Sequence, residues 1–323
     1  MKKPEVPATT HMLDRAMRAQ QFSLHNTSAT TCVACPSCLQ PIAFPAASGC
    51  AQPLKRHKDC WQDRIFCSRT VYECPRTDFW FTHPQLTSQE LSIAYGNHHS
   101  ASTSSGGRSL DQVAFIRQHL FDGPWQREFA RNRTARRNVM RIVEIGCSKD
   151  AVLMRNLREP ERQLVCYEPS RNGSLVEVLT SLLKKNSSNE STAIGTLFDA
   201  TEHVARFGQI DLFISSHVLE HHANLCDFAT ELFAAMSPGG AVFTETPNHD
   251  RNGILRAHGH SGGVFHITFP SPRAMVLIME SAGFRLGVLQ TVSCASAARC
   301  GLAAAMDGAA VRSIFFKPSV ALA

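Results

Sequence analysis

The strongest constraint on this chain is the alternation of short apolar segments with helix-length stretches through its C-terminal half. The apolar segments cover residues 141–146, 163–169, 211–216, 241–246 and 284–292. Parallel strands need long crossover connections, usually helices, so this alternation favours a parallel sheet with helices on both faces. A last apolar run, residues 311–317, follows a short turn with glycine and is expected to return antiparallel at or near the sheet edge. The sequence therefore predicts an α/β fold with a doubly wound, mostly parallel sheet.

Three regions precede this main domain, which we assign to residues 139–323. Residues 1–30 are polar and lack periodicity, as expected for a flexible leader. Residues 31–96 contain seven of the 12 cysteines together with proline- and serine-rich turns, and fit a small cysteine-rich ribbon module. Residues 97–138 begin as a linker rich in histidine, serine and glycine and continue as an apolar helical segment that we expect to cap the main domain.

Composition narrows the class of protein. No apolar run reaches the roughly 18 residues of a membrane span, and the N-terminus lacks the apolar core of a signal peptide. We therefore expect a soluble, cytoplasmic protein without a membrane partner. The net charge of +6 is modest, and the arginines gathered between residues 127 and 141 fit a solvated helix face better than a nucleic-acid patch.

Two predicted strands end in acids at a spacing that suits a nucleoside. Residues 143–150 read V-E-I-G-C-S-K-D, where Glu144 and Gly146 end a strand before a helix-forming segment. Ligands of open α/β sheets bind at this carboxyl end, because a tight turn lets backbone amides approach them. Glu168 ends the next strand within Y-E-P-S, and a carboxylate there can accept hydrogen bonds from both ribose hydroxyls. Taken singly, the glycine turn fits a structural turn equally well, and Glu168 fits an ordinary strand-end charge.

Later segments complete a family pattern. They read G-T-L-F-D at residues 195–199, D-L-F-I-S-S-H-V-L-E-H at 211–221, S-P-G-G at 237–240 and T-E-T-P-N at 244–248. Together with the two strand ends, they resemble the class I S-adenosylmethionine-dependent methyltransferases, particularly a branch in which a cysteine ribbon precedes the catalytic domain. The resemblance covers residues 139–290 well and the ribbon loosely. It implies a seven-stranded Rossmann-like sheet and methyl transfer from S-adenosyl-L-methionine.

The same resemblance implies which residues hold the cofactor. Glu144 matches a position near the methionine moiety, and Gly146 with Cys147 forms the turn that admits the cofactor. Glu168 matches the acid that holds the ribose, and Asp199 matches a position that commonly faces the adenine amine.

Three histidines are candidates for the acceptor side of the site. His217 and His221 follow the fourth strand, and His266 in F-H-I-T-F-P matches a family position on the substrate side. A sulfonium is already an activated methyl donor, so alignment matters more than catalytic groups. His221 is the best candidate for a general base, because the unperturbed pKa of histidine lies close to neutrality. The alternative is that His221 orders the loop or the cofactor pocket.

Two metal-binding alternatives concern the segment that contains His217 and His221. H-V-L-E-H matches the H-x-x-E-H pattern of inverted zinc peptidases, which requires a continuous helix through the motif. Residues 211–216 read instead as a strand that runs straight into it, so the peptidase is a remote alternative. A milder alternative is a divalent metal bound by His217, Glu220 and His221 inside a methyltransferase. This arrangement resembles some quinone-pathway members of the family.

The ribbon suggests a separate zinc site with one ligand in question. Cys35 and Cys38 have the C-x-x-C spacing that places two thiolates on one metal. A second knuckle should begin at Cys74, but its second cysteine is absent, so zinc requires a substitute such as Cys67 or Cys60. The predicted ligands are Cys35, Cys38, Cys67 and Cys74, and the alternative is a ribbon that has lost its metal.

The leading function is methyl transfer from S-adenosyl-L-methionine to a small-molecule acceptor. The first rival is a methyltransferase-fold binding protein without catalysis, which Ser148 and Asp150 favour because the family usually has glycine there. The second rival is an RNA methyltransferase, supported only by the arginine segment. Neither the acceptor atom nor the oligomeric state follows from the sequence.

Overall fold

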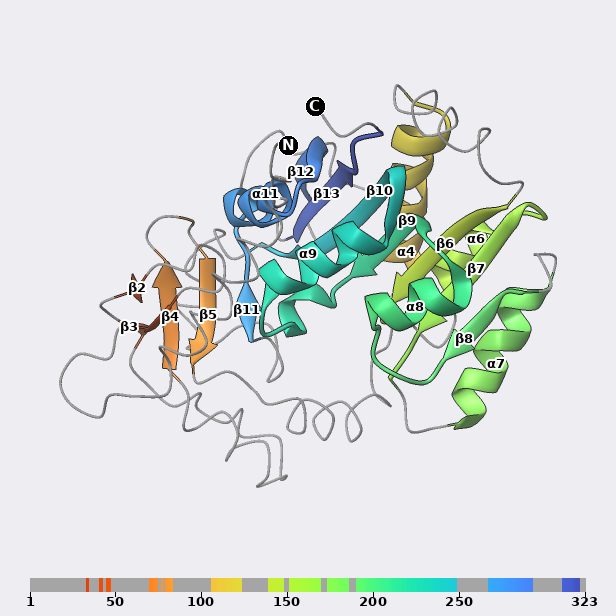
Figure 1. Cartoon of the computed structure of the whole chain (residues 1–323), viewed down its shortest axis with the longest axis horizontal. Helices are drawn as coiled ribbons and strands as arrows, with labels where there is room; N and C mark the ends of the chain where they lie inside the picture. The colour runs from red at the N-terminus through yellow and green to blue at the C-terminus, as the bar shows by residue number, and fades with distance from the viewer. Residues whose placement is uncertain are drawn as a thin grey trace, which may run out of the picture.

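The main feature of the fold is a seven-stranded sheet with strands in the order β12-β13-β10-β9-β6-β7-β8 (Figure 1). This computed structural model describes residues 33–34, 41–42, 45–47, 70–74, 77, 79–83, 106–123, 139–147, 151–169, 173–185, 190–248, 267–292 and 310–319. The strands are β6 (Met140–Ile145), β7 (Arg162–Tyr167), β8 (Thr192–Ile194), β9 (Ile210–Ser216), β10 (Met236–Pro247), β12 (Arg285–Val292) and β13 (Ala310–Phe316).

The pairing confirms the mixed α/β sheet expected from the alternating segments. The strands β8, β7, β6, β9 and β10 pair parallel to their neighbours. β13 runs antiparallel between β10 and β12, next to the sheet edge. The chain moves outward from β6 through β7 and β8, and then returns to β9 on the other side of β6. The carboxyl ends of β6 and β9 therefore flank a topological switch point, where ligands of open sheets bind.

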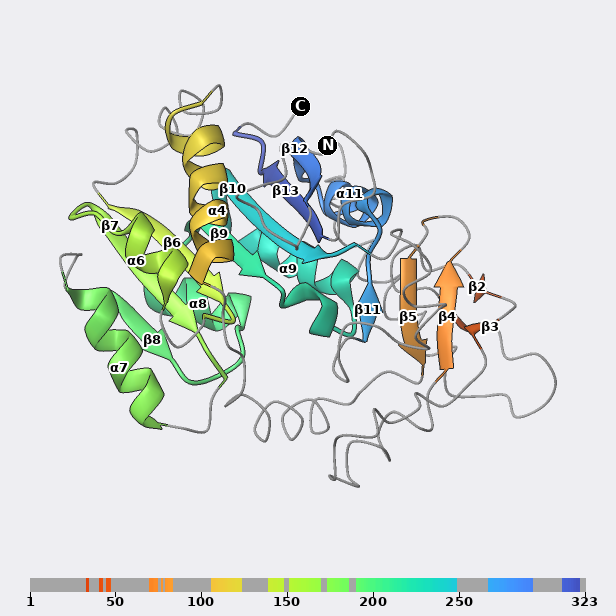
Figure 2. The same ribbon diagram turned by 180° about the vertical axis from the view of Figure 1, so that it is seen from behind.

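Helices cover both faces of the sheet because successive strand residues point to opposite sides. α8 (Ala200–Phe207), α9 (Leu225–Ala235) and α11 (Pro272–Ser281) cover the face that is in front in Figure 1. The reverse view shows α4 (Gly106–Ile116), α6 (Val152–Leu157) and α7 (Gly173–Lys184) on the other face (Figure 2). Ile142 and Val143 illustrate the alternation, because Ile142 belongs to the core under α4 and Val143 to the core under α9.

α4 lies within the segment expected to cap the main domain. It continues as one turn of π-helix, η1 (Arg117–Phe121), and both pack on α6 and the sheet. The helical part ends ahead of Gly123-Pro124. A Cβ at residue 123 would collide with the carbonyl oxygen of Gln118, so the helix end requires glycine there.

Part of the predicted ribbon region joins the main domain through a second sheet. The short strands β1 (Val33–Ala34) and β2 (Pro41–Ile42) pair with each other. The second sheet has the order β11-β5-β4-β3, with β3 (Pro45–Ala47), β4 (Thr70–Cys74), β5 (Phe79–His83) and β11 (Thr268–Phe269). β11 lies far along the chain, between the main sheet's last parallel strand and α11, and it pairs antiparallel with β5.

Packing also ties this hairpin to the main domain. Phe79 and Phe81 are buried in the same core as α9 and α11. In addition, the hydroxyl of Ser271 donates to the carbonyl of Thr77 at 3.1 Å. No helix in the described part of the chain is long and apolar enough to cross a membrane.

Candidate active site

The turn after β6 is built around Gly146. Its backbone has φ +68°, a left-handed conformation that favours glycine, and a Cβ there would collide with the side chain of Val218. Its amide donates to the carbonyl of Tyr167 at 2.8 Å, which fixes the turn against the end of β7. The glycine therefore keeps the backbone tight at the switch point of the sheet.

Two buried carboxyl groups lie at the ends of the adjacent strands β6 and β7. Glu144 and Glu168 are each only 4% exposed. Burial, together with the charge of Glu168, raises the pKa of Glu144 to about 8. Burial also raises the pKa of Glu168 to about 7. Buried carboxyl groups beside a glycine turn are suited to hold hydroxyl groups and a positive charge, so these residues fit a cationic nucleoside cofactor.

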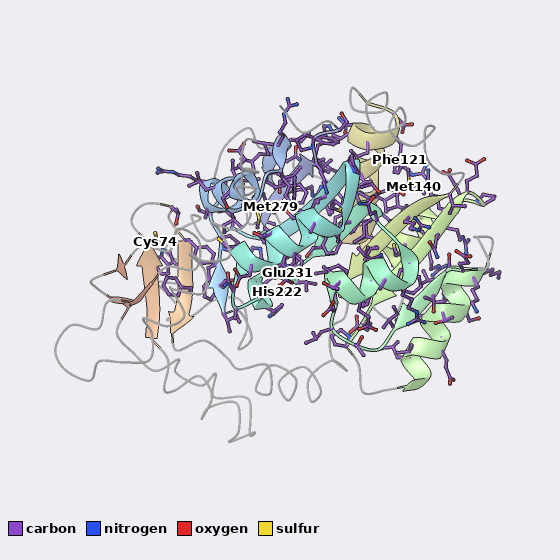
Figure 3. All side chains as sticks on the ribbon, viewed as in Figure 1. Cys74, Phe121, Met140, His222, Glu231 and Met279 are labelled. Carbon is purple, nitrogen blue, oxygen red and sulfur yellow. A yellow bond between two sulfur atoms is a disulfide. The ribbon has the colours of Figure 1, made fainter. Side chains whose placement is uncertain are left out.

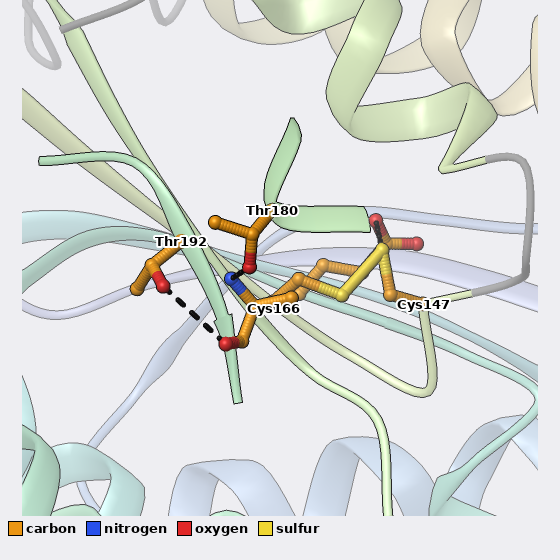
Figure 4. Close-up of a disulfide and its surroundings, with 6 residues drawn as sticks. Cys147, Cys166, Thr180 and Thr192 are labelled. Carbon is orange, nitrogen blue, oxygen red and sulfur yellow. Dashed lines mark hydrogen bonds between the residues drawn. A yellow bond between two sulfur atoms is a disulfide. The ribbon is translucent and has the colours of Figure 1, made fainter. Parts of the chain in front are cut away.

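Cys147 directly follows this turn and is joined by a disulfide to Cys166 on β7 (Figure 4). Both residues are fully buried. The sulfur of Cys147 lies 3.3 Å from Oε2 of Glu144, so it also contacts the first of the two carboxyl groups. Nothing in the spacing of the cysteines indicated this pairing. The covalent link connects the glycine turn to the strand that leads to Glu168.

Asp199 is exposed and lies at the start of α8. Its Oδ1 accepts a hydrogen bond from the backbone amide of Glu202 at 2.8 Å, so it caps the helix. The residue thus has a local structural role that is sufficient to explain an acid at this position. Its part in cofactor binding stays a prediction.

The carboxyl ends of β9 and β10 carry a second cluster of charged groups. His217 follows β9 with a left-handed backbone, φ +55°, and its amide donates to the carbonyl of Glu245 on β10 at 2.8 Å. Its ring nitrogens face two carboxylates: Nδ1 lies 3.2 Å from Glu220 and Nε2 lies 3.3 Å from Glu245. Glu245 is in turn paired with Arg312 of β13.

His221 is the last residue of a short 3-10 turn, η2 (Leu219–His221), and is partly buried. His222, labelled in Figure 3, follows it. Its ring packs on Phe228 of α9, with ring centroids 4.4 Å apart. Burial, followed by the charge of His221, lowers the pKa of His222 to about 4 despite the opposing effect of Glu220. His222 is therefore a neutral packing residue.

The geometry rules out the helix that the peptidase alternative requires. β9 runs to Ser216, His217 adopts a left-handed conformation, and η2 has only three residues. Among the described residues, no group of three or more histidine, cysteine or acidic side chains is arranged to hold a metal ion. The described residues therefore do not support a divalent site on His217, Glu220 and His221.

Several predicted residues lie outside the described part of the chain. They are His266, Cys35, Cys38 and Cys67, together with Ser148 and Asp150. Of the predicted zinc ligands only Cys74 is described, and it is buried at the end of β4 in the core beneath α11. The ribbon zinc site therefore stays a prediction.

Sequence reasoning missed Glu245 and Arg312. Arg312 lies in the largely apolar segment V-R-S-I-F-F-K and is 3% exposed, while Glu245 is fully buried within T-E-T-P-N. A charged residue inside a buried strand is costly without a partner, so each was itself a signal of a buried pair.

Comparison with known proteins shows the family of this chain. The model of a family described as a methyltransferase domain matches residues 116–288, more than half of the chain. A search of curated protein sequences finds no match.

The solved structures that match this chain are distant from it in sequence. N-methyltransferase NodS from Bradyrhizobium japonicum WM9, in complex with S-adenosyl-L-homocysteine, is 17% identical, with a TM-score of 0.38 over 66% of this chain and 98% of that chain. Magnesium protoporphyrin IX methyltransferase from Synechocystis PCC 6803, with the same molecule bound, is 13% identical, with a TM-score of 0.42 over 72% of this chain and 89% of that chain. The [4+2]-cyclase SpnF is 14% identical, with a TM-score of 0.47 over 73% and 99%.

Proposed function

Because the chain belongs to the methyltransferase domain family, we propose that it transfers a methyl group from S-adenosyl-L-methionine to a small-molecule acceptor. The observation that carries this proposal is the pair of buried carboxyl groups, Glu144 and Glu168, at the ends of adjacent strands beside the Gly146 turn. A cationic nucleoside supplies hydroxyl groups and a positive charge, both of which a pair of buried carboxyl groups is suited to hold.

When bound, the cofactor supplies a methyl group already activated by a sulfonium, so the protein mainly has to align the acceptor and exclude water. Glu168 would accept hydrogen bonds from the ribose hydroxyls, and Glu144 would lie near the methionine moiety. Gly146 and Cys147 would present backbone to the cofactor. The exposed Asp199 would contact the adenine amine in addition to capping α8.

On the acceptor side we assign His221 as the group that takes the proton of the acceptor. It is partly buried at the end of η2, beyond the carboxyl end of β9, and the partly buried His222 beside it is held neutral because its pKa is lowered to about 4. His266 is proposed to line the same side of the site.

The direct test is calorimetric titration of the full chain with S-adenosyl-L-methionine, followed by incubation with isotopically labelled cofactor and a metabolite extract. We expect saturable binding and labelled small molecules detectable by mass spectrometry. Binding without label transfer to any metabolite would favour the binding-protein alternative. Label in RNA, with binding that weakens steeply as salt rises, would favour an RNA methyltransferase.

Replacing Glu168 by alanine should weaken cofactor binding by roughly 1–3 kcal/mol, because two ribose hydroxyls lose a charged acceptor. Calorimetry on the folded variant measures this loss. Glu177→Ala is the matched control, since Glu177 is an exposed acid on α7 of the same domain. Equal affinities for the two variants would show that Glu168 does not hold the ribose.

A further inference from the structure

Five side chains of alternating charge cross the carboxyl edge of the main sheet. In order they are Glu220, His217, Glu245, Arg312 and Asp111. They come from η2, the turn after β9, β10, β13 and α4, so the series connects four separate parts of the sequence. Such a series holds its members together most strongly where it is buried, because water screens the charges least there.

Both ring nitrogens of His217 face a carboxylate. Its Nδ1 and Nε2 lie 3.2 and 3.3 Å from the carboxylates of Glu220 and Glu245, whose side chains are each 1% exposed. A neutral imidazole donates from one nitrogen and presents a lone pair at the other, which would face a carboxylate oxygen. Only the doubly protonated ring places positive charge beside both buried carboxylates. The position of His217 between two acids therefore favours the cationic ring.

The next link is a buried, two-point ion pair. Nε and Nη2 of Arg312 reach Oε2 of Glu245 at 2.7 and 2.6 Å. The guanidinium also lies 5.2 Å from the ring centroid of Phe115 on α4. Glu245 is thereby held between two cations and cannot turn away from His217 without leaving Arg312 unpaired in the interior.

Two contacts fix α4 to this edge. Asp111 accepts from Nη1 of Arg312 at 3.2 Å, and the buried Gln112 donates to the hydroxyl of Ser216 at 2.7 Å. The outer end of the charged series is thus anchored on the helix that covers the sheet, beside the end of β9.

η2 is held from the opposite side by backbone contacts. The amide of Ile267 donates to the carbonyl of Glu220 at 2.9 Å, and the hydroxyl of Thr268 donates to the carbonyl of Leu219 at 3.2 Å. Because His221 directly follows Glu220, its position depends on both sets of contacts.

We infer that Glu245 and Arg312 are positioning residues for methyl transfer, and that His217 is the cationic link through which they orient η2. His221 is then the only one of the two histidines with the chemistry of a base. This inference rests on the proposed function where it concerns turnover, but the charge state of His217 can be measured without cofactor or acceptor.

The first experiment is nitrogen NMR of the histidine rings in the full chain near neutral pH. We expect both ring nitrogens of His217, assigned with a His217→Gln variant, to carry protons, and Glu245→Gln to convert the ring to a neutral tautomer. Glu280→Gln, which removes an exposed acid on α11, should leave the His217 signals unchanged. A neutral His217 ring in the wild-type protein overturns the inference, and this result does not depend on whether the chain binds cofactor.

The second experiment follows label transfer from S-adenosyl-L-methionine to the metabolite fraction of an extract. Glu245→Gln should slow transfer by about 10- to 100-fold, the cost of misaligning a reacting group, with cofactor affinity within about twofold of wild type. Equal losses of cofactor affinity and transfer, or an unchanged rate, contradict a positioning role. Absence of cofactor binding by the wild-type protein would instead defeat the proposed function and leave the NMR result standing.

Discussion

Replacing His221 by alanine is expected to slow methyl transfer by about a hundredfold to ten-thousandfold, the usual cost of losing a general base. Cofactor affinity should stay close to that of the wild-type protein, because Glu144 and Glu168 lie at the ends of β6 and β7 while His221 lies beyond β9. The rate of label transfer and the calorimetric affinity for S-adenosyl-L-methionine measure the two effects separately.

His119→Ala is a suitable control for this experiment. His119 is likewise partly buried, but it lies on η1, where it packs on Phe115 with ring centroids 4.5 Å apart. The His119→Ala variant should lose some stability and keep the wild-type rate of methyl transfer. If His221→Ala instead loses thermal stability and cofactor affinity together, the histidine holds the pocket and does not move a proton.

Replacing Glu144 by glutamine should stabilise the cofactor-free protein at alkaline pH. The pKa of Glu144 is about 8 in the folded protein and near 4.5 when unfolded, so the folded state holds a proton that the unfolded state releases between these values. The wild-type free energy of unfolding should therefore fall as pH rises from about 4.5 to 8, by on the order of 3–5 kcal/mol. Glu168, with its pKa of about 7, acts in the same direction over a narrower window.

Urea unfolding across this pH range tests the prediction. The glutamine variant should match the wild-type protein near the acidic end and exceed its stability at the alkaline end, while binding S-adenosyl-L-methionine more weakly. Glu177→Gln on α7 is the control and should follow the wild-type curve. Parallel curves for wild type and Glu144→Gln would show that the carboxyl group is not titrating in the interior.

Strand patterns in the sequence predicted most of the main sheet, because buried parallel strands are short and continuously apolar. The segment at residues 211–216 became β9, Ile210–Ser216, with one residue added. The segment at 241–246 was too short: β10 begins at Met236, and the S-P-G-G turn lies inside it as an irregularity between Met236 and Ala241. β8 has only three residues, which is too short for a hydrophobic pattern to indicate.

The candidate site, like the sheet, was only partly predictable from the sequence. The residues at the ends of β6 and β7 follow one another closely in the chain, so local motifs were enough to find them. The charged series on the other side of the site joins partners as far apart as Arg312 and Asp111, 201 residues from each other. No short motif can encode such a pairing, and only the presence of charge within an apolar strand gave a signal.

The pairing of β11 with β5 has a consequence for how the protein is made. β5 ends at His83 and β11 begins at Thr268, so the hairpin leaves the ribosome long before the strand that completes its sheet. Contacts of such long range form slowly, since much of the chain must be ordered to close them. During that interval Phe79 and Phe81, which are buried in the finished molecule, lack the α9 and α11 surfaces that cover them. The nascent chain should therefore depend most on chaperones, and be most prone to aggregate, until the residues of α11 have been synthesised.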